Sequence, residues 1–161
     1  MRSRAGAEGT GLRELMGLAP SPVVVVSGRA AGGASLGLTV STFVSVSLDP
    51  QLALISVARG SRTWARIARS GRFAVSLLGA DDEWLARRFA GPGERFRGVA
   101  HEPGPGGLPV LRAAYAAAAF ELAERHPAGD HEIVIGELIA ARVTAARRPL
   151  IHHRGAYATV A

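Results

Sequence analysis

The side chains most able to bind or react gather in residues 37–52, a stretch rich in hydroxyl groups. Thr39, Ser41, Ser45 and Ser47 recur at mostly alternate positions, so an extended strand would place them on one face. The stretch carries no charge until the Asp-Pro turn near its end. A strand face that is neither apolar nor charged suits a flat, polar, uncharged ligand held by hydroxyl and backbone contacts. A polar strand inside an all-β core would give the same pattern, so this stretch alone leaves both interpretations open.

A second candidate is the turn at residues 59–63, which reads Arg-Gly-Ser-Arg-Thr between a predicted strand and a predicted helix. The hydroxyls of Ser61 and Thr63, the guanidinium groups and the free N–H groups of a helix N-terminus could converge there on a phosphate. Either hydroxyl could instead simply cap the helix. Because most helices need a cap and few bind phosphate, the turn taken alone favours capping.

A third candidate is the Gly-Asp-His sequence at residues 129–131, which precedes a long predicted strand. His131 could donate a proton or a hydrogen bond, and Asp130 could fix the tautomer of its ring. An Asx turn beside a solvated histidine would look the same. This motif therefore needs support from other parts of the chain.

The other histidines do not form a metal site in this interpretation. His152 and His153 would point to opposite faces of a strand, and His101 and His126 lack partners at metal-ligand spacing. The chain contains no Gly-x-Ser-x-Gly elbow, no Walker loop and no Gly-x-Gly-x-x-Gly after a strand. We therefore predict no metal site and neither of the two best-known nucleotide cradles.

The size and composition of the chain fit one domain with its own core. It has 161 residues, of which 48% are hydrophobic. No apolar run reaches the ~20 residues that span a bilayer, and no long apolar segment follows Arg2 and Arg4 as a signal peptide would require. The absence of cysteine excludes disulfides and thiolate chemistry. We expect a cytoplasmic protein without membrane association.

The positive charge does not indicate nucleic-acid binding. The net charge is +6 and the isoelectric point is about 11.3, but all 19 basic residues are Arg. Arginine raises the isoelectric point without requiring a strong positive field. The arginines are scattered, and only 6% of residues are aromatic, too few for a base-stacking platform. Nucleic acid is therefore not an expected partner.

Apolar periodicity and turn residues divide the chain into short elements. Strands are expected over residues 22–27, 36–47 (as one strand or two), 52–57, 73–78 and 133–143, with a terminal hairpin of 150–153 and 157–160. Helices are expected over 12–18 and 64–70, and a third begins at its cap, Asp81. Residues 113–125 fit either helix or strand, and residues 28–33 and 90–109 are expected to be loops. Gly136 marks a bulge or a close approach within its strand.

These elements predict a mainly β, antiparallel barrel with a few short peripheral helices. Residues 10–161 would form one domain, and residues 1–9 would form a disordered tail.

Several of these segments, in this order, resemble the flavin reductase-like family. The matching segments are residues 37–50, 59–63, 70–78, 85–90, 129–131, 135–137 and 149–157. The resemblance implies an FMN-binding split β-barrel. Many family members are the reducing components of two-component flavin monooxygenases.

The resemblance also implies roles for particular residues. The isoalloxazine and ribityl groups of the flavin would be lined by Thr39, Val40, Ser41, Thr42, Ser45 and Val46. The flavin phosphate would be held by Ser61 and Thr63, helped by Arg62. His131 would lie near the face where the nicotinamide stacks, with Arg154 and Tyr157 close to the same pocket. The family commonly has Asn where this chain has Ser41, which would alter the strength or selectivity of that contact.

The implied function is an NAD(P)H-dependent flavin reductase. It would transfer hydride from NADH or NADPH to FMN or FAD and supply reduced flavin to a partner monooxygenase, working as a homodimer with its flavin sites near the interface. One alternative is a split-barrel flavoprotein that keeps its flavin tightly bound and acts as an oxidase or natural-product redox enzyme. Another is a non-catalytic binding module.

Overall fold

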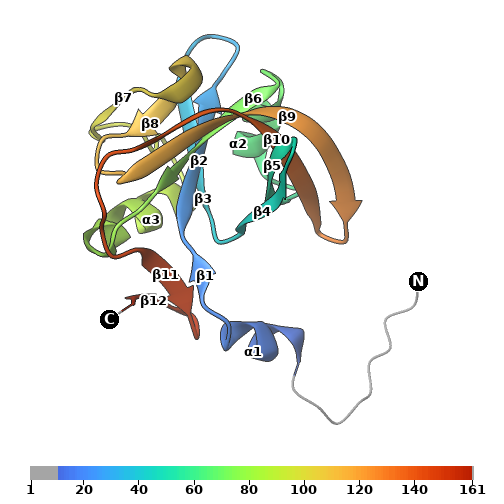
Figure 1. Ribbon diagram of the computed structural model, residues 1–161, viewed down its shortest axis with the longest axis vertical. Helices are drawn as coiled ribbons and strands as arrows, with labels where there is room; N and C mark the ends of the chain where they lie inside the picture. Colours follow the sequence, from blue (N-terminus) through green and yellow to red (C-terminus); the bar gives the residue numbers. More distant parts are fainter. Residues whose placement is uncertain (1–10, 161) are drawn as a thin grey trace.

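The computed structural model describes residues 11–160, which are built around a seven-stranded antiparallel sheet (Figure 1). The strand order is β3 (Ser35–Val40), β2 (Val24–Arg29), β6 (Arg72–Leu77), β9 (Ala116–Ala128), β10 (His131–Val143), β5 (Gln51–Ala58) and β4 (Phe43–Leu48). The sheet curls into a barrel whose edge strands β3 and β4 do not pair with each other. The predicted antiparallel split β-barrel is therefore confirmed, with residues 36–47 forming two strands.

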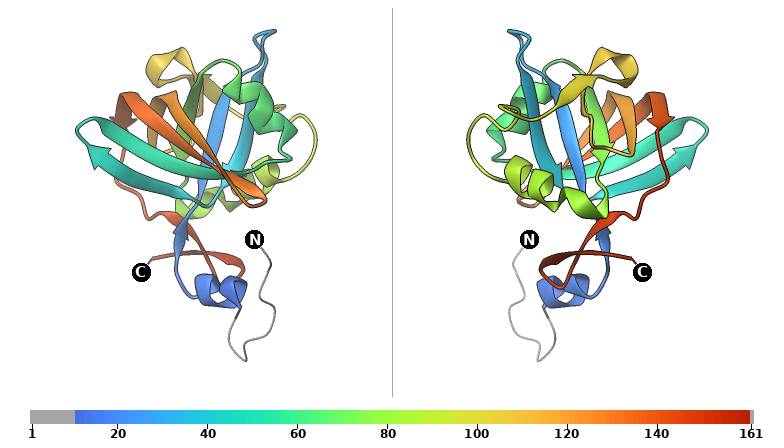
Figure 2. Two further views of the ribbon diagram at one scale, coloured as in Figure 1. Left: turned by 90° about the vertical axis from the view of Figure 1, so that its right-hand side faces the viewer. Right: turned by 90° about the vertical axis from the view of Figure 1, so that its left-hand side faces the viewer.

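A smaller unit projects from one end of this barrel (Figure 2). It consists of helix α1 (Leu12–Gly17) and a three-stranded sheet of β1 (Ser21–Pro22), β11 (Leu150–His153) and β12 (Ala156–Thr159). The last two strands form the predicted terminal hairpin. The tail predicted for residues 1–9 lies outside the described residues. Within residues 11–160, no helix is long and apolar enough to cross a membrane.

The run of valines at 23–26 joins two buried clusters. Val24 and Val26 face the barrel interior, where Trp64 and Ile67 from helix α2 (Arg62–Ala68) also pack. Val23 and Val25 face the opposite way, against helix α3 (Glu83–Ala90). The run is continuously apolar because both faces of the strand are buried. Full burial of each such side chain contributes roughly 1.5–3 kcal/mol.

Two predicted loops contain more regular structure than their composition indicates. Strand β2 continues to Arg29, into the expected loop at 28–33. Residues 90–109 contain β7 (His101–Pro103) and the short helix η2 (Pro105–Gly107), and lead into β8 (Pro109–Leu111). Phe96 and Leu108 anchor this segment in the core. The prediction of one long surface loop was wrong because these apolar anchors are sparse among the glycines and prolines.

The predicted cap at Asp81 was also wrong. Asp81 lies inside a short helix, η1 (Ala80–Asp82), which precedes α3. The neighbouring Asp82 is the buried residue, and its carboxylate accepts a hydrogen bond from the Gly79 backbone N–H at 2.9 Å. The ambiguous segment 113–125 is largely strand β9, because β6 and β10 pair with it on both sides.

Gly136 is both a bulge and a close approach. The register between β10 and β9 shifts between Ile135 and Gly136. A Cβ at this position would lie 2.7 Å from a ring carbon of Phe73 and 2.8 Å from the Cβ of Phe120. Only glycine lets the backbone approach these two stacked rings so closely.

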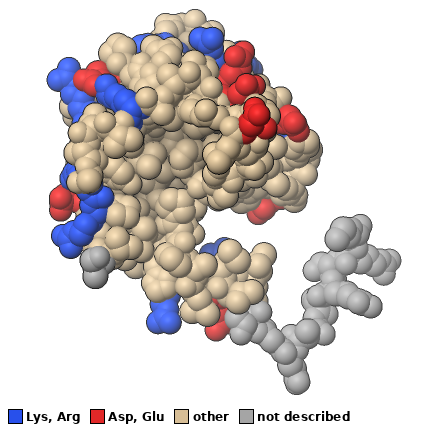
Figure 3. Space-filling model, viewed as in Figure 1, with Lys and Arg blue, Asp and Glu red and all other residues tan. Residues whose placement is uncertain are grey.

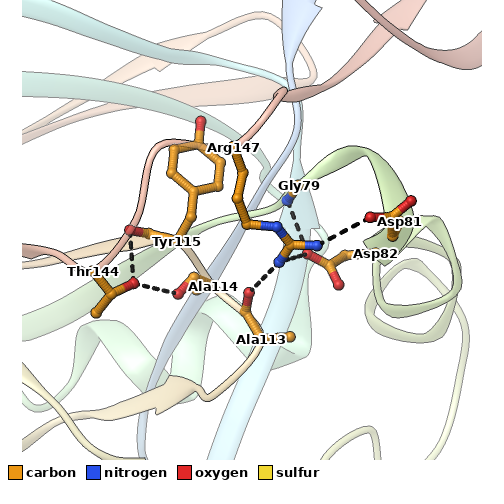
Figure 4. Close-up of polar contacts among 8 residues, drawn as sticks. All are labelled: Gly79, Asp81, Asp82, Ala113, Ala114, Tyr115, Thr144 and Arg147. Atoms are coloured by element: carbon orange, nitrogen blue, oxygen red, sulfur yellow. Dashed lines mark hydrogen bonds and ion pairs between the residues drawn. The ribbon is translucent and has the colours of Figure 1, made fainter.

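A connecting strap, residues 144–149, ties the C-terminal sheet to the barrel (Figure 4). The Arg147 guanidinium donates to the carboxylates of Asp82 and Asp81 at 3.2 and 3.3 Å and to the Ala113 carbonyl at 3.0 Å. The Thr144 hydroxyl donates to the backbone carbonyl of Tyr115 at 2.9 Å. The side chain of Tyr115 is partly buried, and this burial raises the pKa of its phenol. These contacts fix how β11 and β12 leave the barrel.

Candidate functional site

A cavity of about 380 Å³ opens where β3 ends, and we call it the main cavity. Its walls come from the bend after β3, the end of β5, the start of α2 and the C-terminal part of α3. Of the predicted site residues it brings together Thr39, Val40, Ser41, Thr42, Ser61 and His131. These residues lie far apart in the sequence, and the sheet order brings them to one place.

The hydroxyl groups in the main cavity fall into two kinds. Thr39 donates its hydroxyl to the Ala86 carbonyl at 2.7 Å, which joins β3 to α3. Ser41, Thr42 and Ser56 have no side-chain hydrogen bond to any residue in the described range 11–160. These three hydroxyls are therefore available to a ligand.

Ser56 was not identified from the sequence. It lies on β5 between the buried residues Ile55 and Val57, so its side chain points away from the core. A serine alternating with buried aliphatic residues was the signal that could have revealed it.

The turn at 59–63 places its two hydroxyl residues differently. The Ser61 hydroxyl caps α2, because it accepts a hydrogen bond from the Trp64 backbone N–H at 3.2 Å. Thr63 accepts a hydrogen bond at 3.2 Å from the guanidinium of Arg95. Arg62 is exposed and does not line the main cavity. Helix capping is therefore observed at Ser61, which also reaches the cavity wall.

Arg95 is the cationic residue in the wall of the main cavity, and it was missed because it lies in the segment predicted to be a loop. Its Nε donates to the Gly91 carbonyl at 2.6 Å. Its Nη1 donates to the Gly37 carbonyl at 2.8 Å and to the Thr63 hydroxyl at 3.2 Å. Partial burial lowers its pKa, but arginine stays charged at neutral pH.

These bonds leave one nitrogen of Arg95 free. A guanidinium has five N–H donors, and those on Nε and Nη1 are accounted for. Nη2 has no partner among residues 11–160. Two donors of a rigidly held cation therefore remain for an anionic ligand.

His131 begins β10 and also lines the main cavity. Its Nδ1 lies 2.7 Å from a carboxylate oxygen of Asp130, the neighbour expected to fix its tautomer. The hydrogen bond and the charge of His131 lower the pKa of Asp130. With Nδ1 held in this way, Nε2 is the ring atom left for a ligand.

Tyr157 reaches the site from the C-terminal sheet. It lines a smaller cavity of about 220 Å³ whose wall also includes Thr39, Val40 and Ser41. The guanidinium carbon of Arg87 lies 5.1 Å from the centroid of the Tyr157 ring, which fixes one face of the ring. The two cavities are therefore neighbours, separated by the end of β3.

Arg154 is not brought to either cavity. It occupies the turn between β11 and β12 with a positive φ of 50°, and it is exposed. Its backbone N–H donates to the Gly17 carbonyl at 2.8 Å, so the turn packs toward α1.

Ser45 and Val46 are also separated from the main cavity. The chain bends at Ser41, and β4 then pairs with β5 through a bulge between Ser45 and Ser47. Ser45 lines a different groove of about 270 Å³ under the β4–β5 hairpin, and Val46 is 48% exposed. The prediction that the four hydroxyls share one strand face was wrong, because it assumed an unbroken strand.

The charged side chains of the described residues do not gather as those of a metal centre would. Within residues 11–160 no three His, Asp or Glu side chains are placed to hold a metal ion. On the face drawn in Figure 3, basic and acidic side chains form small separate groups with wide uncharged areas between them. A continuous basic face, which nucleic-acid binding proteins use, is not seen there.

Comparisons with known proteins match nearly the whole chain. The family model described as "Flavin reductase like domain" matches residues 16–161. The chain is 38% identical over 160 residues to the NADH-dependent FMN reductase AsuE2 of Streptomyces nodosus subsp. asukaensis, covering 94% of this chain and 84% of that protein. It is 37% identical over 142 residues to the actinorhodin polyketide dimerase of Streptomyces coelicolor, covering 88% and 80%.

Solved structures agree with the sequence comparisons. The NADH:FAD oxidoreductase SgcE6 of Streptomyces globisporus, in complex with NAD and FAD fragments, superimposes with a TM-score of 0.86 at 33% identity. The superposition covers 93% of this chain and 91% of that one. Flavin reductase PheA2 in its native state gives a TM-score of 0.83 at 32% identity, covering 92% and 95%.

Proposed function

Since the chain belongs to the flavin reductase-like domain family, we propose that it is an NAD(P)H:flavin oxidoreductase that supplies reduced flavin to a partner monooxygenase. Relatives named as NADH-dependent flavin reductases support the reaction. Relatives named as reductase subunits of a monooxygenase and of a demethylase support the partner.

The observation that carries this proposal is the donor set of the main cavity. The hydroxyls of Ser41, Thr42 and Ser56, which have no side-chain hydrogen bond within residues 11–160, share one cavity with Arg95, whose Nη2 is also without a partner in that range. A flavin mononucleotide presents a flat polar ring system and a phosphate, which match the hydroxyls and the cation respectively. The cavity volume of about 380 Å³ lies within the range of small-molecule sites.

The phosphate is assigned to Arg95 and its neighbour Thr63. Because the Thr63 oxygen accepts from Arg95, its hydroxyl hydrogen remains to be donated to a phosphate oxygen. Thr63 lines the adjoining cavity that Arg95 also borders, and Ser61 lines the main cavity beside Arg95, where it adds a polar group. Arg62, the cation expected from the resemblance, is replaced in this role by Arg95.

His131 and Tyr157 are assigned to the nicotinamide side. His131 offers Nε2 to an amide or ribose group, and Tyr157 closes the neighbouring cavity. The bound flavin supplies the hydride-accepting chemistry. The protein's part is to hold both partners in reach, exclude water and place N–H and O–H donors where negative charge grows.

A homodimer belongs to the same proposal. Strand β4 is an open sheet edge and exposes Val44 and Leu48, and α1 exposes Leu12 and Leu15. Exposed apolar surface next to an unpaired edge favours association with a second copy. Ser45 and Val46 would then lie at the subunit interface, which keeps them as candidate flavin contacts.

We also expect this enzyme to work in the cytoplasm.

The activity is tested by mixing the purified protein with NADH or NADPH and either FMN or FAD. We expect loss of nicotinamide absorbance that requires added flavin. No rate above a protein-free blank with any of the four pairs would refute the reductase function.

The relative named as a polyketide dimerase favours a second candidate, a natural-product redox enzyme that retains its flavin. Flavin that co-purifies with the protein, together with slow NADH turnover, would favour this candidate. A flavin that is removed by gel filtration would favour the diffusible-flavin reductase.

A further inference from the structure

A second cavity, of about 520 Å³, begins where the main cavity ends. Arg95 lines both cavities and stands between them. The other walls of the second cavity come from the start of β3 (Ser35, Leu36), from Thr63 and Arg66 on α2, and from the loop that follows α3. No step of the proposed hydride transfer uses this space.

The second cavity is positively charged. Arg66, Arg95 and Arg97 line it, against a single carboxylate, Glu94. Glu94 and Arg97 form an ion pair at 2.7 Å that is largely exposed and therefore weak. Arg66 has no ion pair or side-chain hydrogen bond with any residue from 11 to 160, so its guanidinium is available to a ligand.

The loop that forms this wall is held rigidly from α3. Arg88 donates from Nε to the Arg95 carbonyl at 3.1 Å and from Nη2 to the carbonyls of Glu94 and Arg97 at 3.2 and 2.8 Å. Phe96 is packed edge-to-face against Phe89, with ring centroids 4.9 Å apart. The cavity is thus formed before a ligand arrives, which reduces the entropy lost on binding.

We propose that the second cavity binds the adenosine monophosphate half of FAD, so that FAD is the preferred flavin. This rests on the proposed function, in which the flavin phosphate lies at Arg95. FMN ends at that phosphate, whereas FAD continues from it through a second phosphate to ribose and adenine. Arg95 faces the junction of the two cavities and can contact both phosphates.

The other residues that line the second cavity fit the remainder of the adenosine monophosphate half of FAD. Arg66 supplies a second cation for the pyrophosphate, and Ser35 supplies a hydroxyl for the ribose. Leu36 and Phe96 give an apolar surface suited to an adenine ring. An adenosine phosphate also forms part of NADH, so the test must separate the two sources.

The test compares the dissociation constants of FAD and FMN, measured by quenching of flavin fluorescence. Wild-type protein binds FAD more tightly than FMN. Arg66→Gln weakens FAD binding roughly tenfold, the loss expected for one charge-assisted hydrogen bond, and leaves FMN binding unchanged. Arg69→Gln is the matched control, because Arg69 is exposed at the end of the same helix and lines neither cavity. The Arg69→Gln variant leaves the dissociation constants of FAD and FMN unchanged.

Three results would overturn the proposal. One is equal affinity of the wild-type protein for FAD and FMN. Another is an Arg66→Gln variant whose ratio of FAD to FMN affinity is unchanged. The third is a variant with normal FAD binding but a raised KM for NADH when FMN is the acceptor, which would assign the cavity to the dinucleotide. If neither flavin binds the wild-type protein, the proposed function itself fails.

Discussion

Single polar residues in the main cavity differ in whether the fold already uses their hydrogen bonds. Thr39 and Ser61 are engaged, one with α3 and the other with α2, so they help to build the wall. Ser41, Thr42 and the Nη2 of Arg95 keep donors that no residue between 11 and 160 uses. A ligand gains most from groups that have no internal partner, because binding replaces only their contacts with water. Whether a polar group already has an internal hydrogen-bond partner therefore decides which of the predicted residues we propose as direct ligand contacts.

His131 is the residue whose replacement separates the two substrates. We expect His131→Ala to raise the KM for NADH about tenfold, because Nε2 no longer contacts the nicotinamide nucleotide, and to leave flavin affinity nearly unchanged. Steady-state kinetics at a saturating flavin concentration measure the KM for NADH. His126→Ala is the control, since His126 is exposed and pairs with Glu124 outside the cavity. An unchanged KM in His131→Ala would remove His131 from the site.

The same variant has a pH signature at Asp130. His131 lowers the pKa of the Asp130 carboxyl in the folded protein. A lowered folded pKa stabilises the fold above the unfolded value of about 3.9, and this contribution is lost as the pH falls through the folded pKa. In His131→Ala the Asp130 carboxyl should titrate at higher pH, as followed by NMR. No change in that titration would show that the pair does not form in solution.

Secondary-structure elements determine which residues meet at the site. Local patterns predicted most strands of the large sheet, the three α-helices and a bulge or close approach at Gly136, because alternation and capping are properties of neighbouring residues. They left β9 open between helix and strand and missed β7 and β8. The bend at Ser41 could not be predicted in this way. It depends on β4 pairing with β5, and that pairing moves Ser45 away from Thr39. Arg95 was missed for a related reason, since its loop is ordered by contacts with distant parts of the chain, including Arg88 and Phe89 on α3.

The strap at residues 144–149 leads into β11, which pairs with the strand that carries Tyr157. We expect Arg147→Ala to lower the free energy of unfolding by about 1–3 kcal/mol, because buried Asp82 loses its cation. We also expect a raised KM for NADH, because the C-terminal sheet loosens. Thermal unfolding and kinetics measure the two effects. Arg148→Ala is the control, because its side chain makes no hydrogen bond or ion pair within residues 11–160.

Arg147→Ala has an outcome that would contradict the strap's role. If the variant is destabilised but its KM for NADH is unchanged, the strap stabilises the fold without positioning the site. In Figure 4 the Arg147 guanidinium joins Asp81 and Asp82 of η1 to Ala113 in the loop before β9.

The whole molecule is a barrel with an open side and a projecting C-terminal sheet (Figures 1 and 2). The smaller cavity, closed by Tyr157, lies where these parts meet, and the main cavity adjoins it across the end of β3. This arrangement brings hydroxyls from β5 and from the bend after β3, a cation from a loop and a ring from β12 into two neighbouring cavities. The family resemblance predicted the fold class and the reaction, while our proposal of Arg95 as the phosphate-binding cation rests on the three-dimensional contacts.

The most direct test of this account compares FMN with riboflavin, which lacks the phosphate, in wild type and Arg95→Ala. Binding is measured by fluorescence titration, with Arg69→Ala as the control for removing one positive charge. We predict that wild type binds FMN about ten- to a hundredfold more tightly than riboflavin, as expected for charge-assisted hydrogen bonds. In Arg95→Ala this preference should disappear while riboflavin affinity stays the same. An unchanged ratio of FMN to riboflavin affinity in Arg95→Ala would contradict the assignment of the main cavity as the flavin site with its phosphate at Arg95.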